Sequence, residues 1–306
     1  QRAFCFDPRV VDWPDYIHNV HLPSIVQHAR VKTKPGRTTT DRSKRLRANV
    51  LSPERHVAAF DLENTLIASN VVESYSWLAT RRLNTPERVR YVLRTLKESP
   101  QLLSMDRKDR GDFLRYFYRR YEDAPVEQIE EDAREMLTQL IIAKSFPDGL
   151  RRVREHRALG HRTVLITGAL DFNVAGLKPL FDEIVAAEMS VRPDGTLSGE
   201  MKRVPPTGET RAQVLADYCA AEGFRLEECV AYADSTSDLP LLEAVGHPVA
   251  VNPETRLAAI ARKRGWLVEN WSTAPGMPKP FLPIGTLLSE RERKKYAPSS
   301  SRRFSR

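Results

Sequence analysis

Residues 57–65 read Val57-Ala58-Ala59-Phe60-Asp61-Leu62-Glu63-Asn64-Thr65, and this stretch decides the fold. Its four leading apolar residues are typical of a strand buried in a parallel sheet, and the acids that follow mark the end of that strand. Other compact runs share this character, so the expected strands are His56–Phe60, Arg162–Ile166, Cys229–Ala233 and Pro248–Val251. Because helical patterns separate these runs, the sequence predicts an α/β fold with a parallel sheet.

The helical patterns place apolar residues three and four positions apart. Val89, Val92, Leu93 and Leu96 form one such stripe. Residues 61–161 separate the first two expected strands, which is far more than a simple crossover needs. We therefore expect an inserted helical cap beyond the carboxyl ends of the strands, where ligands bind in parallel sheets.

Composition excludes several classes of protein. Of the 306 residues, 41% are hydrophobic and 29% are charged, so the chain can bury a core and is not globally disordered. It has no apolar run of membrane-spanning length and no secretory leader pattern. Its three cysteines, Cys5, Cys219 and Cys229, are scattered. This spacing favours a reducing compartment, so we expect a cytoplasmic protein. Because it opens on Gln1, the sequence is expected to be a piece of a longer chain.

The net charge of +8 is concentrated in two segments. Residues 30–47 carry a net charge of +7 and residues 291–306 carry +6, so the remaining residues sum to −5. We interpret the two basic segments as solvated linkers. Contact with nucleic acid or anionic lipid is the less favoured alternative, and the segments lack interleaved aromatic residues that could stack on bases.

These patterns divide the chain into five parts. The expected parts are an N-terminal piece (1–30), a basic linker (31–54), a core (55–67 and 145–272), a helical cap (68–144) and a basic mobile tail (273–306).

Polar residues follow three of the expected strands. Asp61 and Glu63 follow the first, Thr167 and Gly168 the second, and Asp234 the third, with Asp238 four residues later. These ends meet at one edge of a parallel sheet. Crowded carboxylates repel one another, and a divalent cation relieves the repulsion, so the sequence predicts a Mg²⁺-dependent phosphoryl-transfer site.

In this order, the motifs resemble the haloacid dehalogenase-like superfamily, and in particular its helical-cap subfamily that contains phosphoserine phosphatase. The resemblance covers about residues 55–272 and is strongest at residues 233–248, 194–199 and 208–211. It implies a Rossmann-like core with an inserted helical cap domain. It also implies a cytoplasmic hydrolase that acts on a small phosphorylated metabolite.

The resemblance assigns roles to individual residues. Asp61 would be the nucleophile that forms an aspartyl-phosphate, and Glu63 the acid and base. Thr167, Gly168 and Arg211 would bind the phosphoryl oxygens. The Mg²⁺ ligands would be Asp61, the backbone carbonyl of Glu63, Asp234 and Asp238.

Two residues depart from the family pattern. Glu63 stands where the family has Asp, and Arg211 stands where it usually has Lys; Lys202 is a nearby substitute for that basic residue. If the site otherwise keeps the family geometry, Glu63→Asp should raise turnover. If the site has widened to suit Glu63, the same change should lower it. The alternative function is a catalytically weakened domain with a binding or docking role.

The substrate is less well defined. Phosphoserine-type enzymes have a Glu near the position of Asn70, whereas this chain has Glu73 three residues later. The cap also carries Arg115, Arg119 and Arg120, which we interpret as a solvated helix face; binding of an anionic substrate group is the alternative.

Residues 6–16 resemble the closing segment of fatty-acyl reductase-type short-chain proteins. This resemblance implies an upstream reductase-type domain, covalent or docked. The chain itself has no dinucleotide-binding Gly-rich loop, so no reductase activity is assigned to it.

Overall fold

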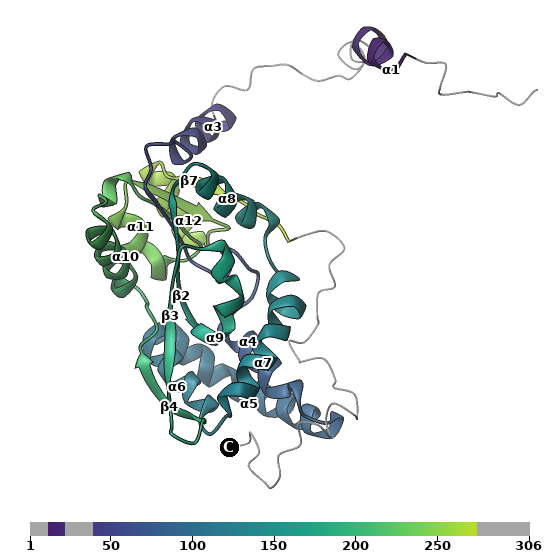
Figure 1. Ribbon diagram of the computed structural model, residues 1–306, viewed down its shortest axis with the longest axis vertical. Helices are drawn as coiled ribbons and strands as arrows, with labels where there is room; N and C mark the ends of the chain where they lie inside the picture. The colour runs from purple at the N-terminus through teal and green to yellow at the C-terminus, as the bar shows by residue number, and fades with distance from the viewer. Residues whose placement is uncertain (1–11, 22–38, 274–306) are drawn as a thin grey trace, which may run out of the picture. The chain divides into compact units, whose positions relative to one another are not determined.

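The computed structural model describes residues 12–21 and 39–273 (Figure 1). The chain divides between Lys44 and Arg45 into two units. The described part of the first unit includes α1 (Trp13–Asp15) and η2 (Tyr16–His21). Most of the expected N-terminal piece and nearly all of the expected tail lie outside the described residues.

The second unit is built on a seven-stranded sheet with the order β4-β3-β2-β1-β5-β6-β7. The strands are β1 (Val57–Phe60), β2 (Arg162–Leu170), β3 (Glu183–Val191), β4 (Leu197–Arg203), β5 (Val230–Ala233), β6 (His247–Val251) and β7 (Leu267–Glu269). Neighbouring strands are parallel except for β3 and β4, which form an antiparallel hairpin. The predicted α/β class with a Rossmann-like parallel sheet is confirmed.

The four expected strands all form, with different ends. β2 continues to Leu170, and its pairing with β3 is irregular between Ile166 and Leu170. The sequence did not identify β7 or the full length of the β3–β4 hairpin. The turn of that hairpin contains Gly195, whose φ of +78° is in the left-handed region that favours glycine.

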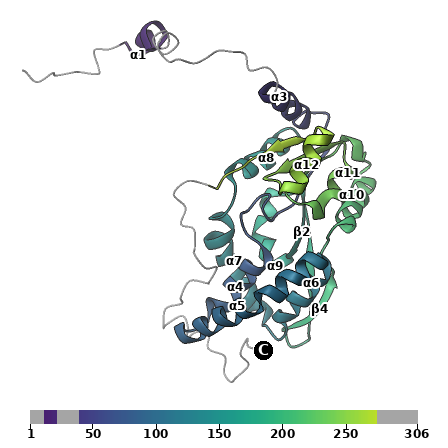
Figure 2. The same cartoon turned by 180° about the vertical axis from the view of Figure 1, so that it is seen from behind.

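Helices cover both faces of the sheet (Figures 1 and 2). They are α8 (Pro147–Ala158), α9 (Asp171–Val174), α10 (Glu209–Glu222), α11 (Leu239–Ala244) and α12 (Thr255–Arg264), with the short turns η5 (Ala175–Leu180), η6 (Leu226–Glu228) and η7 (Thr236–Asp238). Along β1, Ala58 and Phe60 belong to one apolar cluster, whereas Val57 and Ala59 belong to the other. Burial on both faces explains why the strands are continuously apolar.

The chain between β1 and β2 forms a helical cap, in agreement with the expected insertion. Its elements are α4 (Val71–Arg81), α5 (Thr85–Lys108), α6 (Arg110–Tyr118), η3 (Arg119–Tyr121), α7 (Val126–Met136) and η4 (Leu137–Ile142). The segments that lead into and out of the insertion lie next to each other, because Ala68 N–H donates to the Lys144 carbonyl at 2.8 Å. A second backbone hydrogen bond connects the cap with the β3–β4 hairpin: Leu197 N–H donates to the Ala124 carbonyl at 2.8 Å.

The structure differs from the expected linker at residues 31–54, because helix α3 spans Thr39–Val50. Val50 is buried, and Leu46, one turn earlier, packs against the same apolar cluster. Arg47 donates to Glu269 at 2.7 Å. The sequence favoured a linker because basic residues dominate this segment and its apolar face consists of only two residues, Leu46 and Val50.

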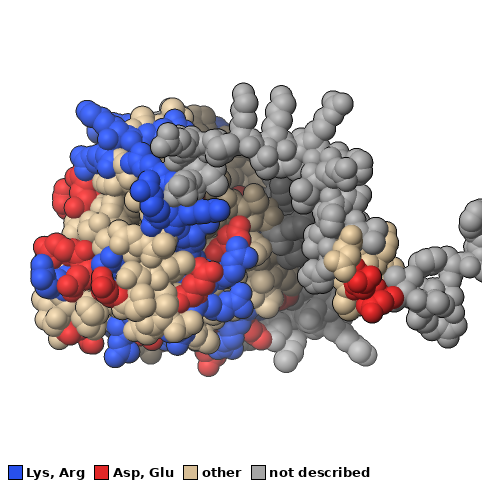
Figure 3. All heavy atoms as spheres, turned by 90° about the horizontal axis from the view of Figure 1, so that it is seen from above, with Lys and Arg blue, Asp and Glu red and all other residues tan. Residues whose placement is uncertain are grey.

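In the view of Figure 3 the surface carries both signs of charge: some Lys and Arg side chains run from the upper left towards the centre, and others are scattered among the acids. The net charge of −5 outside the two basic segments therefore does not mean that each face of the protein is acidic. Within the described part of the chain, each helix is too short or too polar to cross a lipid bilayer.

Gly246, between α11 and β6, lies where the backbone of Glu227 leaves no room for a side chain. A Cβ atom on this residue would lie 1.9 Å from the backbone carbonyl oxygen of Glu227. We expect Gly246→Ala to lower the free energy of unfolding by about 3 kcal/mol in urea titrations. The control is Gly195→Ala, where no atom lies within 4 Å of the added Cβ and only the positive φ is penalised. That change should cost about 1 kcal/mol. Equal losses for the two variants would contradict the close approach at Gly246.

Candidate active site

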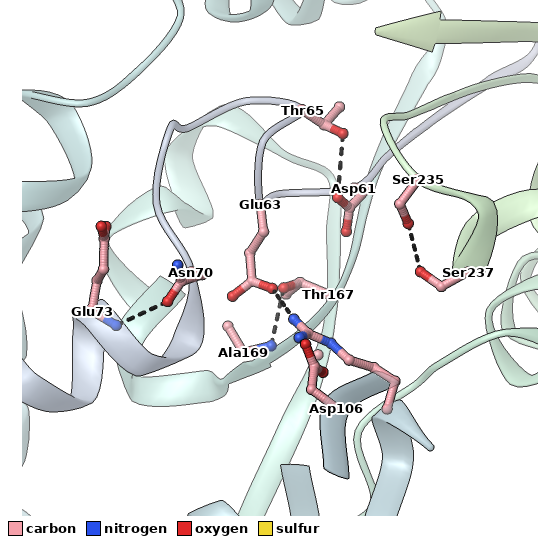
Figure 4. Close-up of polar contacts among 12 residues, drawn as sticks. Asp61, Glu63, Thr65, Asn70, Glu73, Asp106, Thr167, Ala169, Ser235 and Ser237 are labelled. Atoms are coloured by element: carbon pink, nitrogen blue, oxygen red, sulfur yellow. Dashed lines mark hydrogen bonds and ion pairs between the residues drawn. The ribbon is translucent and has the colours of Figure 1, made fainter. Parts of the chain in front are cut away.

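Asp61 lies one residue beyond β1, at the carboxyl edge of the sheet. Its backbone N–H still donates to the Tyr232 carbonyl of β5 at 3.0 Å, so the sheet fixes its backbone. The loop turns sharply at Asn64, whose φ is +54°. This turn brings Thr65 back, and its Oγ1 donates to Asp61 Oδ2 at 3.2 Å (Figure 4). The carboxylate of Asp61 is therefore buried and held in one orientation.

Arg211 reaches this carboxylate from α10. Its Nη1 donates to Asp61 Oδ1 at 2.7 Å and also to Asp238, while its Nε donates to the Pro206 carbonyl at 3.1 Å. Burial opposes the charge of Arg211, but the carboxylates of Asp238 and Asp61 more than offset it and raise the pKa of the guanidinium. Lys202 is exposed and pairs with Glu188 at the hairpin. Of the two basic residues that the sequence offered, Arg211 lies in the site.

Three carboxylates converge beside Arg211. Oxygen atoms of Asp61, Asp234 and Asp238 all lie within 4.8 Å of one another. Burial raises the pKa of Asp61 to about 7 and that of Asp234 to about 8; repulsion from the neighbouring acids adds to both shifts, and Arg211 opposes them. Ser235 holds Asp238 by donating to its Oδ2 at 2.9 Å. An all-oxygen cluster whose acids repel one another suits a hard divalent cation such as Mg²⁺.

Glu63 is held from the cap. Its Oε2 accepts from Arg110 Nη2 at 2.9 Å, and Arg110, at the start of α6, also donates to Asp106 at 2.7 Å. Burial raises the pKa of Glu63, although Arg110 opposes this shift. Sequence analysis missed Arg110. Its position 47 residues after Glu63 gave no local signal.

Thr167 and Gly168 lie in the irregular final part of β2. Thr167 is fully buried, and its Oγ1 accepts from Ala169 N–H at 3.0 Å. The Gly168 carbonyl accepts from the hydroxyl of Tyr118 at 2.6 Å. A Cβ atom on Gly168 would lie only 3.0 Å from Leu114 Cδ1. Helix α6 therefore contacts both the Glu63 loop and this final part of β2, and it closes the site from the cap side.

The other candidate residues have structural partners. Asn70 caps α4 by accepting from Glu73 N–H at 3.0 Å, and the Glu73 carboxylate accepts from Lys144 Nζ at 2.7 Å. The three arginines expected on a solvated helix face pair with acids: Arg115 with Asp112, Arg119 with Glu200 and Arg120 with Glu98.

The sequence model of the haloacid dehalogenase-like hydrolase family matches residues 58–243. The chain belongs to this family. The match says nothing of residues 1–30, so the upstream reductase-type domain stays a prediction.

Relatives of the chain include the inhibition of morphological differentiation protein of Streptomyces azureus. It is 33% identical over 218 residues, which are 69% of this chain and 77% of that protein. A histidinol-phosphatase of Neisseria meningitidis is 27% identical over 71% of this chain and 99% of its own length. A phosphoserine phosphatase of Mycobacterium tuberculosis is 29% identical, with 71% of each chain covered.

Solved structures share the fold. A Bordetella pertussis protein of unknown function superposes with a TM-score of 0.61 at 23% identity, covering 70% of this chain and 98% of that one. A substrate-bound phosphoserine phosphatase superposes with a TM-score of 0.52 at 19% identity, covering 72% and 94%.

The raised pKa values of Asp61 and Asp234 predict how the stability of the metal-free protein depends on pH. Both lie above the usual value of 3.8 for Asp, so the folded state favours the protonated acids, and stability is lost as the pH rises from about 4 to about 8. We expect the Tm in EDTA to fall by about 5 °C between pH 5.5 and 8, and Mg²⁺ to restore it mainly at pH 8.

Asp234→Asn should flatten this pH dependence and remove the response to Mg²⁺. The control is Asp217→Asn on the exposed side of α10, which should behave like the wild type. A Mg²⁺ response that persists in Asp234→Asn would place the cation elsewhere.

Proposed function

We propose that the chain is a Mg²⁺-dependent phosphomonoester hydrolase that acts through an aspartyl-phosphate on Asp61. The observation that carries this proposal is the convergence of the Asp61, Asp234 and Asp238 carboxylates beside Arg211. The relatives named as phosphatases support it.

In this proposal, an Asp61 oxygen attacks the phosphorus atom and the ester oxygen leaves with a proton from Glu63. Glu63 then removes a proton from the water that hydrolyses the aspartyl-phosphate. Arg211 and the final part of β2 at Thr167 and Gly168 bind the phosphoryl oxygens. When bound to the three carboxylates, Mg²⁺ would neutralise charge on the phosphoryl group.

The substrate we propose is a small phosphorylated metabolite other than phosphoserine. An ammonium group would need a free carboxylate near the start of α4. Asn70 occupies the helix cap there, and Glu73 is paired with Lys144 at 2.7 Å.

The alternative is a catalytically weakened domain that docks beside an upstream reductase-type domain. It is motivated by Glu63 and Arg211, which both depart from the family pattern. Magnesium-dependent turnover of a generic aryl phosphate separates this alternative from the hydrolase.

Asp61→Asn should abolish turnover, because an amide cannot form the acyl phosphate. A loss of about 10⁴-fold or more in kcat is expected for a covalent nucleophile. The matched control is Asp217→Asn, which should keep the wild-type rate. Wild-type kinetics in Asp61→Asn would show that the nucleophile is another residue.

The structure favours the widened-site expectation for Glu63, because the longer side chain is what reaches Arg110. We expect Glu63→Asp to lower kcat by about tenfold, since a displacement of about 1 Å misplaces the acid. Glu63→Gln should lose about 10²-fold or more, because it cannot donate or accept the proton. A Gln variant as active as the wild type would remove Glu63 from the mechanism, and a faster Asp variant would show that the site keeps the family geometry.

A further inference from the structure

Helix α5 exposes a stripe of aliphatic side chains on the cap. The stripe consists of Val89, Leu93, Leu96 and Leu103, with exposed fractions of 56%, 63%, 62% and 56%. At about 100° per residue, these four positions fall within an arc of about 80° on one side of the helix. The sequence predicted a helix from part of this stripe. The structure shows that the stripe does not face the cap core.

The opposite side of α5 provides the packing that holds the helix on the cap. Leu102 is buried there, and Met105 packs against the same apolar cluster. The hydroxyl of Tyr91 donates to Ser76 of α4 at 3.1 Å. The exposed stripe is therefore a second apolar face, which the fold of the described residues does not use.

The charged residues of α5 differ in whether they are paired. Arg90, Arg94 and Lys97 are exposed and form a row beside the stripe. The acids of the helix have partners: Glu87 in the capping box, Glu98 with Arg94 and Arg120, and Asp106 with Arg110. Arg90 and Lys97 form no ion pair with any described residue. The exposed charges of Arg90 and Lys97 therefore border one edge of the stripe, whereas Asp106, towards the other edge, is paired with Arg110.

We propose that α5 binds peripherally to the surface of an anionic phospholipid bilayer, with the stripe among the acyl chains and the basic row at the headgroups. An apolar face bordered by Lys and Arg on a helix of low overall hydrophobicity matches such a surface. A second copy of the chain would bring two basic rows together. A single convex helix without exposed aromatic residues in its stripe offers a protein partner few anchor points. This proposal does not depend on the proposed hydrolase activity.

The test is co-sedimentation of the full chain with vesicles of phosphatidylcholine, with and without about a third of phosphatidylglycerol. We expect the partition coefficient to be at least about tenfold higher on the anionic vesicles. Arg90→Gln with Lys97→Gln should lower it by about 25-fold, at about fivefold for each basic residue. Leu93→Ser with Leu96→Ser should lower it by about tenfold or more.

Two matched controls change exposed residues elsewhere and leave both basic terminal segments in place. Arg262→Gln with Lys263→Gln removes two exposed charges from α12, and Val191→Ser with Val204→Ser removes two exposed apolar groups near the hairpin. Both should bind vesicles like the wild type. Circular dichroism shows whether each variant is folded. If the variant at Leu93 and Leu96 unfolds, the vesicle binding of the α5 charge variant still tests the proposal.

Three outcomes would overturn the proposal. Wild-type binding by the α5 charge variant would show that other segments bind the lipid. If the α12 control lost as much vesicle binding as the α5 charge variant, the net charge of the protein, and not helix α5, would explain the binding. A lower mass of the α5 apolar variant in lipid-free light scattering, with unchanged vesicle binding, would show that a second copy covers the stripe.

Discussion

The charge balance around Asp61 is the constraint on which the rest of the structure depends. Three carboxylates, those of Asp61, Asp234 and Asp238, share a small volume at the sheet edge, and Arg211 supplies one positive charge. If all four groups are ionised, the cluster carries two unbalanced negative charges, which a divalent cation would neutralise. Without the cation, burial and then the repulsion between these acids favour their protonated forms, which raises the pKa values of Asp61 and Asp234. Folding this edge and binding a cation are therefore coupled.

The cap covers the carboxyl edge of the sheet, and helix α6 makes the contacts. Along α6, Arg110 meets Glu63, Leu114 packs on Gly168, and the Tyr118 hydroxyl donates to the Gly168 carbonyl. The β3–β4 hairpin supports the same region of the cap through the hydrogen bond of Leu197 to Ala124. A cap fixed at these points excludes water from the acids, and burial of this kind is the largest cause of their raised pKa values.

The sequence predicted what is local and left out what depends on packing. Asp61, Thr167 and Asp234 could be found because each follows an apolar run, and strand ends in a parallel sheet meet at one edge. Arg110 could not be found, since its meeting with Glu63 depends on how the cap folds over the core. The stripe that contains Leu93 shows the same limit: its period correctly predicted a helix, but period alone cannot tell which of two apolar faces is covered.

The two departures from the family pattern are each accommodated by a specific contact. The added methylene of Glu63 carries its carboxylate to Arg110, and the guanidinium of Arg211 contacts Asp61 and Asp238 from one nitrogen while its Nε is held by the Pro206 carbonyl. Buried charges are costly to desolvate unless they are paired, and at this site Glu63 pairs with Arg110 and Asp61 with Arg211. The longer acid and the larger base therefore each have their own partners, Arg110 for Glu63 and the carboxylates of Asp61 and Asp238 for Arg211. These pairs favour a retained hydrolase with its own substrate over a weakened domain.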